Sequence, residues 1–439
     1  MTASRSDRRA MSRREFLRLA GIAGVGLPVA SAVFAACNPH GTADTTTLAH
    51  PGKFGTGGVT VPDTPYPLAR PSAPVTWKLL SDNPAIKSGL APETGTLKVI
   101  GYPDYIYQNI LKEFQTRYST KVEWFSFSTS EEMVANVQAD PSRFDLICTV
   151  TLDNVGRLIA SGVIQPLNHS YLTNFENIWP IYQDPFYDRN DRYTVPYTVY
   201  TTGIAWRNDL VPVDIASMPN PYGILWDTSY KNKVRVLDGA RDVMALGLLD
   251  HDESDVSTAA RSPLALAKAK LLKGAKSMNW KFDNLDYKEL TVAGEWAIHH
   301  TWSGQVAYYV SYLPKGLPIT RFSYLWPPQG TARKPGILQN DVFAVTKGAA
   351  SPVLAHKLVD LLLEPTYALA NYGYEGYQPP LKFIDPDSIV ARGLIPASLK
   401  NIIITEDMVP LGVAELELSP ATTLEYETLY QQITAGAGG

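Results

Sequence analysis

The residues best suited to bind a ligand first occur in the stretch GTLKVIGYPDYI, at 95–106. Its apolar run at 97–100 is typical of a short buried strand. Tyr102, Asp104 and Tyr105 lie in the turn that follows, ahead of a helical pattern. In open α/β sheets, ligands bind outside the carboxyl ends of the strands, and aromatic faces beside a carboxylate suit an organic cation. The alternative is that both tyrosines only cover the end of the sheet.

Further polar and aromatic residues follow the ends of later predicted strands. They are Thr151 and Asp153, Asp238 and Asp242, Trp302 and Gln305, and Asp341. Each is weak evidence by itself. Together they recur at the chain positions where two α/β lobes would expose their ligand-facing loops.

The sequence lacks the motifs of the common enzyme classes, with no P-loop and no nucleophile elbow. Among the seven histidines only His299 and His300 adjoin, and on a strand they point to opposite faces, which is poor metal geometry. Paired phenolates such as those of Tyr308 and Tyr309 suit a ferric ion. The favoured interpretation is that the two tyrosines lie in a helix, with one in the core and the other at its rim. We therefore predict no catalytic residue, no cofactor and no metal.

Length and composition favour an ordinary globular protein with two domains. A chain of 439 residues is too long for one core, and 45% of the residues are hydrophobic and 19% charged. The net charge is -4 and the body of the chain has no basic block, which argues against a nucleic-acid partner. Cys148, in an apolar run, is expected to be a buried thiol.

The N-terminal residues are typical of an export signal that is removed. SRREFLR at 12–18 matches the twin-arginine pattern, and the apolar run at 19–36 is too short and interrupted for a membrane span. FAAC at 34–37 resembles a lipoprotein signal-peptidase box, which would make Cys37 the lipid-bearing first residue; the alternative is an ordinary cleavage site. Loss of residues 1–36 would leave a net charge of -8.

Residues 37–95 are predicted to be a linker and N-terminal extension, rich in Gly, Thr, Pro and Ala. With one acyl chain, such a linker keeps an exported protein near the membrane. Beyond it, strands alternate with helices, which predicts right-handed crossovers and a parallel sheet. The run YTVPYTVYTTGIAW at 193–206 is long enough to cross from one lobe to the other.

From about residue 75 to 433 the chain resembles the spermidine/putrescine-binding lipoproteins of ABC importers. The matching motifs keep their order and spacing and are GYPDYI, SEEM, FDLI, VGRLIASGVIQPL, YTVPYTVYTTGIAW, ILWDTSYKNKVRVLDGARDV, AIHHTWSGQ, DVFAVTKGA and GYQPP. The resemblance implies an α/β, two-lobed type II periplasmic-binding-protein fold. Each lobe would be a mostly parallel sheet flanked by helices, with crossover strands as the hinge. The implied lobes are 96–198 plus 304–349, and 199–303 plus 350–433, followed by a tail at 434–439.

The resemblance also implies a site in which aromatic walls cover methylene groups and carboxylates compensate ammonium groups. The implied ligand-binding residues are Tyr102, Asp104, Tyr105, Thr151, Asp153, Gly239, Asp242, Trp302, Gln305 and Asp341. Several positions differ from the family pattern. Tyr102 stands where Trp is common, Gly239 and Gln305 stand where acids are common, and Gln339 replaces a Trp. Asp153 adds an acid in place of an aromatic residue.

These differences favour a diamine, or a monoamine with a polar body, over a long triamine. The resemblance implies a non-enzymatic, monomeric binding protein that is anchored by lipid outside the cytoplasmic membrane. Its partners would be a small cationic ligand and the ABC permease. Two alternatives are the same fold with another ligand, an amino-acid derivative or a ferric ion, and a secreted hydrolase.

Overall fold

The computed structural model describes residues 64–127, 129–284, 296–309 and 318–437. The predicted signal peptide and the predicted lipidation residue Cys37 lie outside the described residues.

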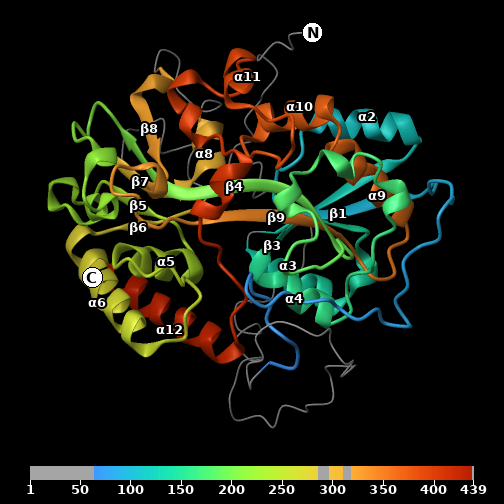
Figure 1. Cartoon of the computed structure of the whole chain (residues 1–439), viewed down its shortest axis with the longest axis horizontal. Coiled ribbons are helices and arrows are strands. Elements are labelled where there is room, and N and C mark those ends of the chain that lie inside the picture. The colour runs from blue at the N-terminus through green and yellow to red at the C-terminus, as the bar shows by residue number, and fades with distance from the viewer. Residues whose placement is uncertain (1–63, 128, 285–295, 310–317, 438–439) are drawn as a thin grey trace, which may run out of the picture. The chain divides into compact units, whose positions relative to one another are not determined.

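Within these residues one mixed sheet runs through the whole fold, in the strand order β2-β1-β3-β9-β4-β7-β5-β6, and β8 pairs with β4 (Figure 1). The strands are β1 (Thr96–Gly101), β2 (Lys121–Ser126), β3 (Leu146–Thr151), β4 (Thr194–Arg207), β5 (Val234–Val236), β6 (Lys281–Phe282), β7 (Ile298–Trp302), β8 (Phe322–Leu325) and β9 (Leu338–Val345). β1 is parallel to β2 and β3, whereas β9 is antiparallel to both of its neighbours.

Strand β4 joins the two halves of the sheet, as the length of its sequence run predicts. Its residues from Thr194 to Thr201 pair with β9, and those from Thr202 to Trp206 pair with β7. All fourteen residues of β4 are buried. The register shifts after Pro196, which has no N–H to donate to a ladder. The two halves of the sheet form the cores of two lobes, which confirms the predicted fold class.

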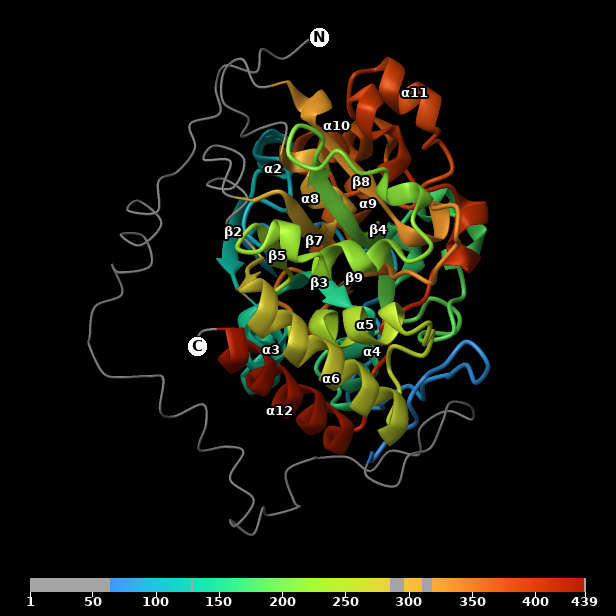
Figure 2. The same ribbon diagram turned by 90° about the vertical axis from the view of Figure 1, so that its left-hand side faces the viewer.

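Helices cover both faces of the sheet (Figures 1 and 2). They are α2 (Gln108–Tyr118), α3 (Ser130–Ala139), α4 (Leu152–Ala160), α5 (Ala240–Asp250), α6 (Arg261–Met278), α8 (Ser303–Tyr309), α9 (Pro352–Leu362), α10 (Pro365–Glu375), α11 (Pro386–Ala391) and α12 (Pro420–Ala437). One face carries α2, α8, α9, α10 and α11. The opposite face carries α3 and α4 under the first lobe, and α5, α6 and α12 under the second.

The hydrophobic cores favour a lobe division that differs from the predicted one after residue 349. Residues of α9 and α10, such as Leu358 and Tyr372, share a core with Leu97 of β1 and Phe114 of α2. The last helix, α12, packs on α5 and α6 in the second lobe. We therefore propose that residues 350–375 belong with the first lobe and that 420–433 belong with the second, whereas residues 397–402 pack on β8 and α8.

The extension that precedes the sheet packs on the first lobe from residue 64 onward. Val75 and Trp77 are fully buried in the core beneath α3 and α4. The Trp77 indole N–H donates to the carbonyl oxygen of Tyr187 at 2.8 Å. Cys148 is buried in β3, as predicted.

Candidate ligand-binding site

The candidate site lies where β3, β9 and β4 run side by side at the centre of the sheet. Asp341 of β9 is paired with Thr151 on β3 and with Thr198 on β4. The turn after β1 brings Tyr105 to the same place, because β1 is the other neighbour of β3. The ends of β1 and β3 therefore converge with the middle of β4 and β9 on one buried carboxylate.

Asp341 is buried, with one oxygen satisfied and the other unpaired. Its Oδ2 accepts a hydrogen bond from the Tyr105 hydroxyl at 2.7 Å and one from the Thr198 hydroxyl at 3.3 Å. Within the described residues, Oδ1 has no hydrogen-bond partner. Burial raises the pKa of Asp341 to about 7, against the opposing effect of hydrogen bonds from Tyr105, Thr198 and Tyr200. A buried oxygen of this kind favours a cationic donor as its partner.

Aromatic rings form a continuous chain of contacts beside Asp341. Ring centroids are 6.0 Å apart for Tyr102 and Tyr105, 5.4 Å for Tyr105 and Tyr377, 5.7 Å for Tyr377 and Tyr200, and 6.5 Å for Tyr200 and Trp302. We call Tyr102, Tyr105, Tyr200 and Tyr377, together with Asp341, the aromatic wall. Such faces cover methylene groups and attract cations.

A second group of charged residues, Asp153, Asp242, Glu415 and Arg241, forms what we call the acidic wall. Burial raises the pKa of Asp242 well above its usual range, and the charge of Glu415 raises it further, while Arg241 and a hydrogen bond from Trp302 lower it. Burial and the charge of Asp153 raise the pKa of Glu415, which Arg241 lowers. These mutual effects place the three carboxylates within electrostatic range of one another.

The acidic wall also has an unpaired acceptor. The Gln339 amide donates to the carbonyl oxygen of Glu415 at 3.2 Å and to its Oε2 at 3.4 Å. Glu415 Oε1 and Gln339 Oε1 have no hydrogen-bond partner among residues that the structure describes. Both are buried acceptors whose hydrogen-bonding capacity is unused within the described residues.

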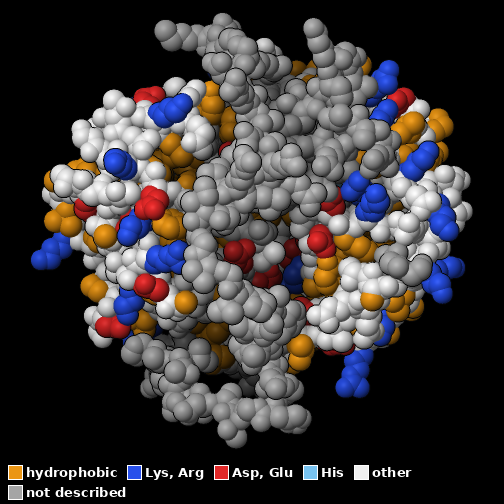
Figure 3. Space-filling model, turned by 180° about the vertical axis from the view of Figure 1, so that it is seen from behind, with side chains coloured by type: hydrophobic (Ala, Val, Ile, Leu, Met, Phe, Trp, Pro, Cys, Tyr) orange, Lys and Arg blue, Asp and Glu red, His pale blue; other side chains and the backbone are white. Residues whose placement is uncertain are grey.

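The two walls lie within electrostatic range of each other. Burial raises the pKa of Tyr102 in the aromatic wall, opposed by its hydrogen bond with Ser130, and the charges of Asp341 and Asp242 add to the increase. Asp153 raises the pKa of Asp341 as well as those of Asp242 and Glu415. Figure 3 views the molecule from behind Figure 1. It shows acidic side chains gathered in a recess near the centre of this rear face.

Local structure explains how the helices present their acids. Thr151 ends β3 and precedes α4, and its hydroxyl accepts from the Asn154 amide at 2.9 Å. Asp153 and Asp242 lie in the first turns of α4 and α5, where the helix dipole favours a negative charge. Gly239 precedes α5, and a Cβ there would stand 2.8 Å from Asp242 Oδ2. The missing side chain therefore makes room for the Asp242 carboxylate.

Three residues that the sequence analysis identifies as candidates belong to neither wall. Asp104 is exposed, with φ at 60°. The buried Gln305 amide donates to the carbonyl oxygen of Asn284 at 3.0 Å. Asp238 is exposed and accepts a hydrogen bond from the Tyr430 hydroxyl. A ligand-binding role of Asp104 and Gln305 stays a prediction.

Sequence reasoning missed Glu415, Tyr200 and Tyr377 as site residues. Tyr377 lies in the GYQPP motif, which is part of the family resemblance, so this motif could have indicated Tyr377 as a site residue. Tyr200 lies within the long strand β4, where alternation alone does not identify a ligand-facing residue. Glu415 lies in the irregular run ELEL before α12, and no local pattern marks it.

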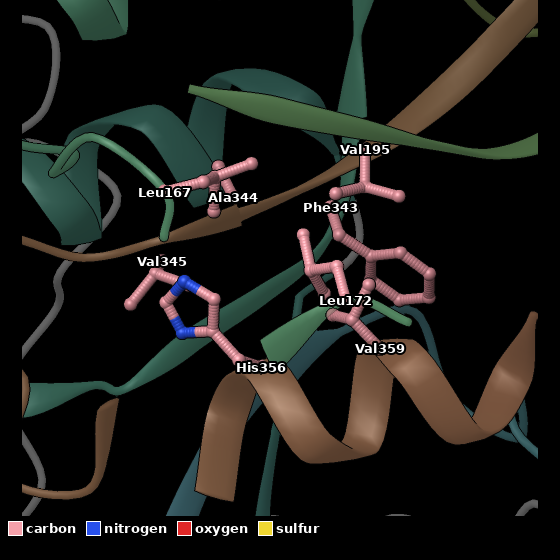
Figure 4. A pocket seen from close by; sticks show the side chains of 8 residues that line it. All are labelled: Leu167, Leu172, Val195, Phe343, Ala344, Val345, His356 and Val359. Carbon is pink, nitrogen blue, oxygen red and sulfur yellow. The ribbon is translucent and has the colours of Figure 1, made fainter. Parts of the chain in front are cut away.

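Two other regions do not offer a competing site. The cavity in Figure 4 is lined by apolar side chains and His356 between α9 and the sheet, and it has no room for a water molecule. His299 is buried with Nδ1 2.7 Å from the Tyr309 hydroxyl, and burial lowers the pKa values of His299 and His300 to about 3. In the described ranges, no group of three His, Cys, Asp or Glu side chains could hold a metal ion.

The fold consists of two α/β lobes joined by the crossing strand β4. Acidic residues of α4 in the first lobe and α5 in the second contribute to the candidate site. These features define a two-lobed ligand-binding protein. Residues 101–369 match the model of the bacterial extracellular solute-binding protein family, and the chain belongs to this family. Among the helices that the structure describes, none is both long and apolar enough to span a membrane.

Individual proteins with similar sequences are binding proteins for amines. The chain is 26% identical to the spermidine/putrescine-binding periplasmic protein of Salmonella typhimurium, over 79% of this chain and 93% of that protein. It is also 26% identical to the putrescine/cadaverine-binding protein of Pseudomonas aeruginosa, over 71% of this chain and 88% of that protein.

The fold is similar to that of a putative spermidine/putrescine ABC transporter protein from Listeria monocytogenes, with a TM-score of 0.65 and 22% identity. That match covers 77% of this chain and 98% of the Listeria chain.

Proposed function

We propose that this chain is the binding component of an ABC importer and captures a polyamine-like dication of the putrescine and spermidine class. The observation that carries the proposal is the unpaired Oδ1 of buried Asp341 beside four tyrosines. A carboxylate taken out of water needs a positive partner, and a ring face over that partner adds about 0.5–2 kcal/mol.

The acidic wall supports a second positive group on the same ligand. Glu415 Oε1 has no partner within the described residues, and the carboxyl groups of Asp153 and Asp242 lie within electrostatic range of it. Arg241 offsets part of this charge, so the wall suits one further ammonium group rather than several. A diamine whose ends meet Asp341 and Glu415 satisfies both walls. The relatives from Salmonella and Pseudomonas, which are named for binding spermidine, putrescine and cadaverine, support the same ligand class.

The proposed role includes export, lipid anchoring and delivery to a permease. The twin-arginine pattern and the cysteine at position 37 support an exported lipoprotein outside the cytoplasmic membrane. We expect a monomer that closes its lobes around the ligand, since hinge closure is the usual motion of such proteins. Labelled fatty acid should be incorporated into the wild-type chain in cells and not into Cys37→Ala; equal labelling of both would contradict the anchor.

Calorimetric titration of residues 38–439 tests the proposed ligand class. We expect heat of binding with putrescine, cadaverine or spermidine. GABA is the matched control, because it has the four carbons of putrescine with a carboxylate in place of one aminomethyl group. Binding of GABA or of ferric ion without any binding of a diamine would contradict the proposal and favour the other ligand classes.

A further inference from the structure

The N-terminal segment at 64–73, which we call the strap, lies beside the candidate site although it precedes the family match that begins at residue 101. It leads directly into Val75 and Trp77, which are buried in the first lobe. The Tyr66 ring packs on Trp77 with centroids 6.3 Å apart. The strap is therefore fixed to the first lobe at its C-terminal end.

The strap is hydrogen-bonded to the segment that leads into α12. The Tyr66 hydroxyl donates to Glu417 Oε1 at 2.6 Å, and Arg70 Nη2 donates to the Glu417 carbonyl oxygen at 2.9 Å. Glu417 is only two residues from Glu415 of the acidic wall. Hydrogen bonds from the strap therefore fix both the side chain and the backbone of Glu417.

The segment at 413–419 is also bonded to both halves of the fold. Val413 forms a β-bridge with Ile337. The Leu416 N–H donates to Ser257 Oγ at 2.8 Å, on the α6 side of the second lobe. The Glu417 carboxylate lies against α4, where it leaves no room for a Cβ at Gly156. Glu415 is thus carried on a short irregular segment whose position depends on contacts from several elements.

The electrostatics of Glu417 connect it to the candidate site. Burial raises its pKa to about 7, whereas the hydrogen bond from Tyr66 and the charge of Arg157 lower it. The charge of Asp153, which belongs to the acidic wall, raises this pKa, and that of Arg70 lowers it. Glu417 therefore lies within electrostatic range of the ligand-facing acids while bonded to the strap.

We propose that Tyr66 and Arg70 are positioning residues for ligand binding: through Glu417 they hold the 413–419 segment so that Glu415 faces the recess. The inference rests on the proposed function, because Glu415 is assigned there to the second ammonium group. It extends the binding site to residues upstream of the family match.

Tyr66→Phe and Arg70→Met test the strap with little change in side-chain volume. Each variant removes one hydrogen bond to Glu417, and the loss of one such bond corresponds to about a threefold to tenfold change in affinity. We expect both variants to bind putrescine more weakly by that factor. Butylamine, which has one ammonium group on the same four-carbon chain, should be affected less, because only the second group reaches Glu415. Arg70→Lys retains a donor and should recover part of the loss.

Tyr171→Phe is the matched control, since it removes another tyrosine hydroxyl that ties the extension to the first lobe. The Tyr171 hydroxyl donates to the Lys87 carbonyl oxygen at 2.7 Å and accepts from the Leu90 N–H at 2.7 Å. We expect it to lower the melting temperature without changing the ratio of putrescine to butylamine affinity. A merely structural role of Tyr66 would give the same result as this control.

Hydrogen exchange without ligand separates this inference from the proposed function. In Tyr66→Phe, amides in 413–419 should exchange faster than in the wild type and in Tyr171→Phe. If the wild type binds no amine, the proposed function fails and exchange alone decides whether the strap holds the segment. Unchanged exchange in Tyr66→Phe, or an affinity ratio equal to that of the control, would overturn the inference.

Discussion

The two walls of the recess compensate negative charge in different ways. In the aromatic wall, the donors to Asp341 are the neutral hydroxyls of Tyr105 and Thr198. In the acidic wall, the positive charge of Arg241 lowers the pKa values of both Asp242 and Glu415. The carboxylate of the aromatic wall thus has no positively charged partner among its donors. In the acidic wall, Arg241 offsets part of the negative charge. We infer that the aromatic wall supplies most of the affinity and that the acidic wall distinguishes between amines.

Asp341→Asn should have the largest effect, because it removes the charge of the aromatic wall and keeps an acceptor for Tyr105. Removal of one partner from a buried ion pair costs about 3–5 kcal/mol, so putrescine should bind at least about 100-fold more weakly. Calorimetry measures the change. Asp252→Asn, an exposed acid paired with Lys334, is the control and should bind normally. Binding within threefold of the wild type would remove Asp341 from the site.

The same substitution should change how stability depends on pH. The pKa of Asp341 rises from 3.8 in the unfolded chain to about 7 in the fold, so the folded state holds the proton more tightly. Its contribution to stability is therefore present at low pH and is lost as pH rises toward 7. In the unliganded protein, Asp341→Asn should unfold at higher urea concentration than the wild type at pH 8, with little difference at pH 4. An identical difference at both pH values would show that Asp341 does not titrate as described.

Glu415→Gln should have a smaller and more selective effect, because Arg241 already compensates part of the acidic wall. We expect about tenfold weaker binding of putrescine, the range of a hydrogen bond to a charged group. Butylamine should bind nearly as before. Titration of both amines gives the ratio, with Glu406→Gln as a control at a glutamate outside both walls. An equal loss for both amines would mean that the two walls do not serve different ends of the ligand.

Tyr102→Leu tests the ring faces of the aromatic wall with the charges left in place. Loss of a cation–π contact should weaken putrescine binding about threefold to tenfold. Tyr102→Trp should restore or slightly exceed wild-type affinity, since indole is the strongest π partner. If Leu and Trp bind alike, Tyr102 only covers the end of the sheet.

Much of the fold and about half of the candidate site follow from sequence, and the reasons differ between the walls. The aromatic wall comes mostly from a contiguous turn at 102–105 and from strand ends, where periodicity and strand order carry information. The acidic wall depends on Glu415, which lies in an irregular segment ahead of α12 and follows no strand end. Hydrophobic patterning indicates that a helix is apolar on one face, but not which lobe covers that face. The lobe assignment of residues 350–375 could not be derived from sequence for the same reason.

Gly239→Ala should have the smallest effect and tests how closely the acidic wall is packed. The backbone φ of Gly239 is -171°, an extended conformation that Ala adopts without strain, so any effect arises from the added Cβ. That atom would stand 2.8 Å from Asp242 Oδ2 and must displace the carboxylate. Because Asp242 is one of three acids in this wall, we expect a two- to threefold loss of putrescine affinity, about 0.4–0.7 kcal/mol, and no loss for butylamine. Gly223→Ala is the control, since a Cβ there meets only Met218 at 4.0 Å. A loss as large as that of Glu415→Gln would instead make Asp242 the principal partner of the second ammonium group.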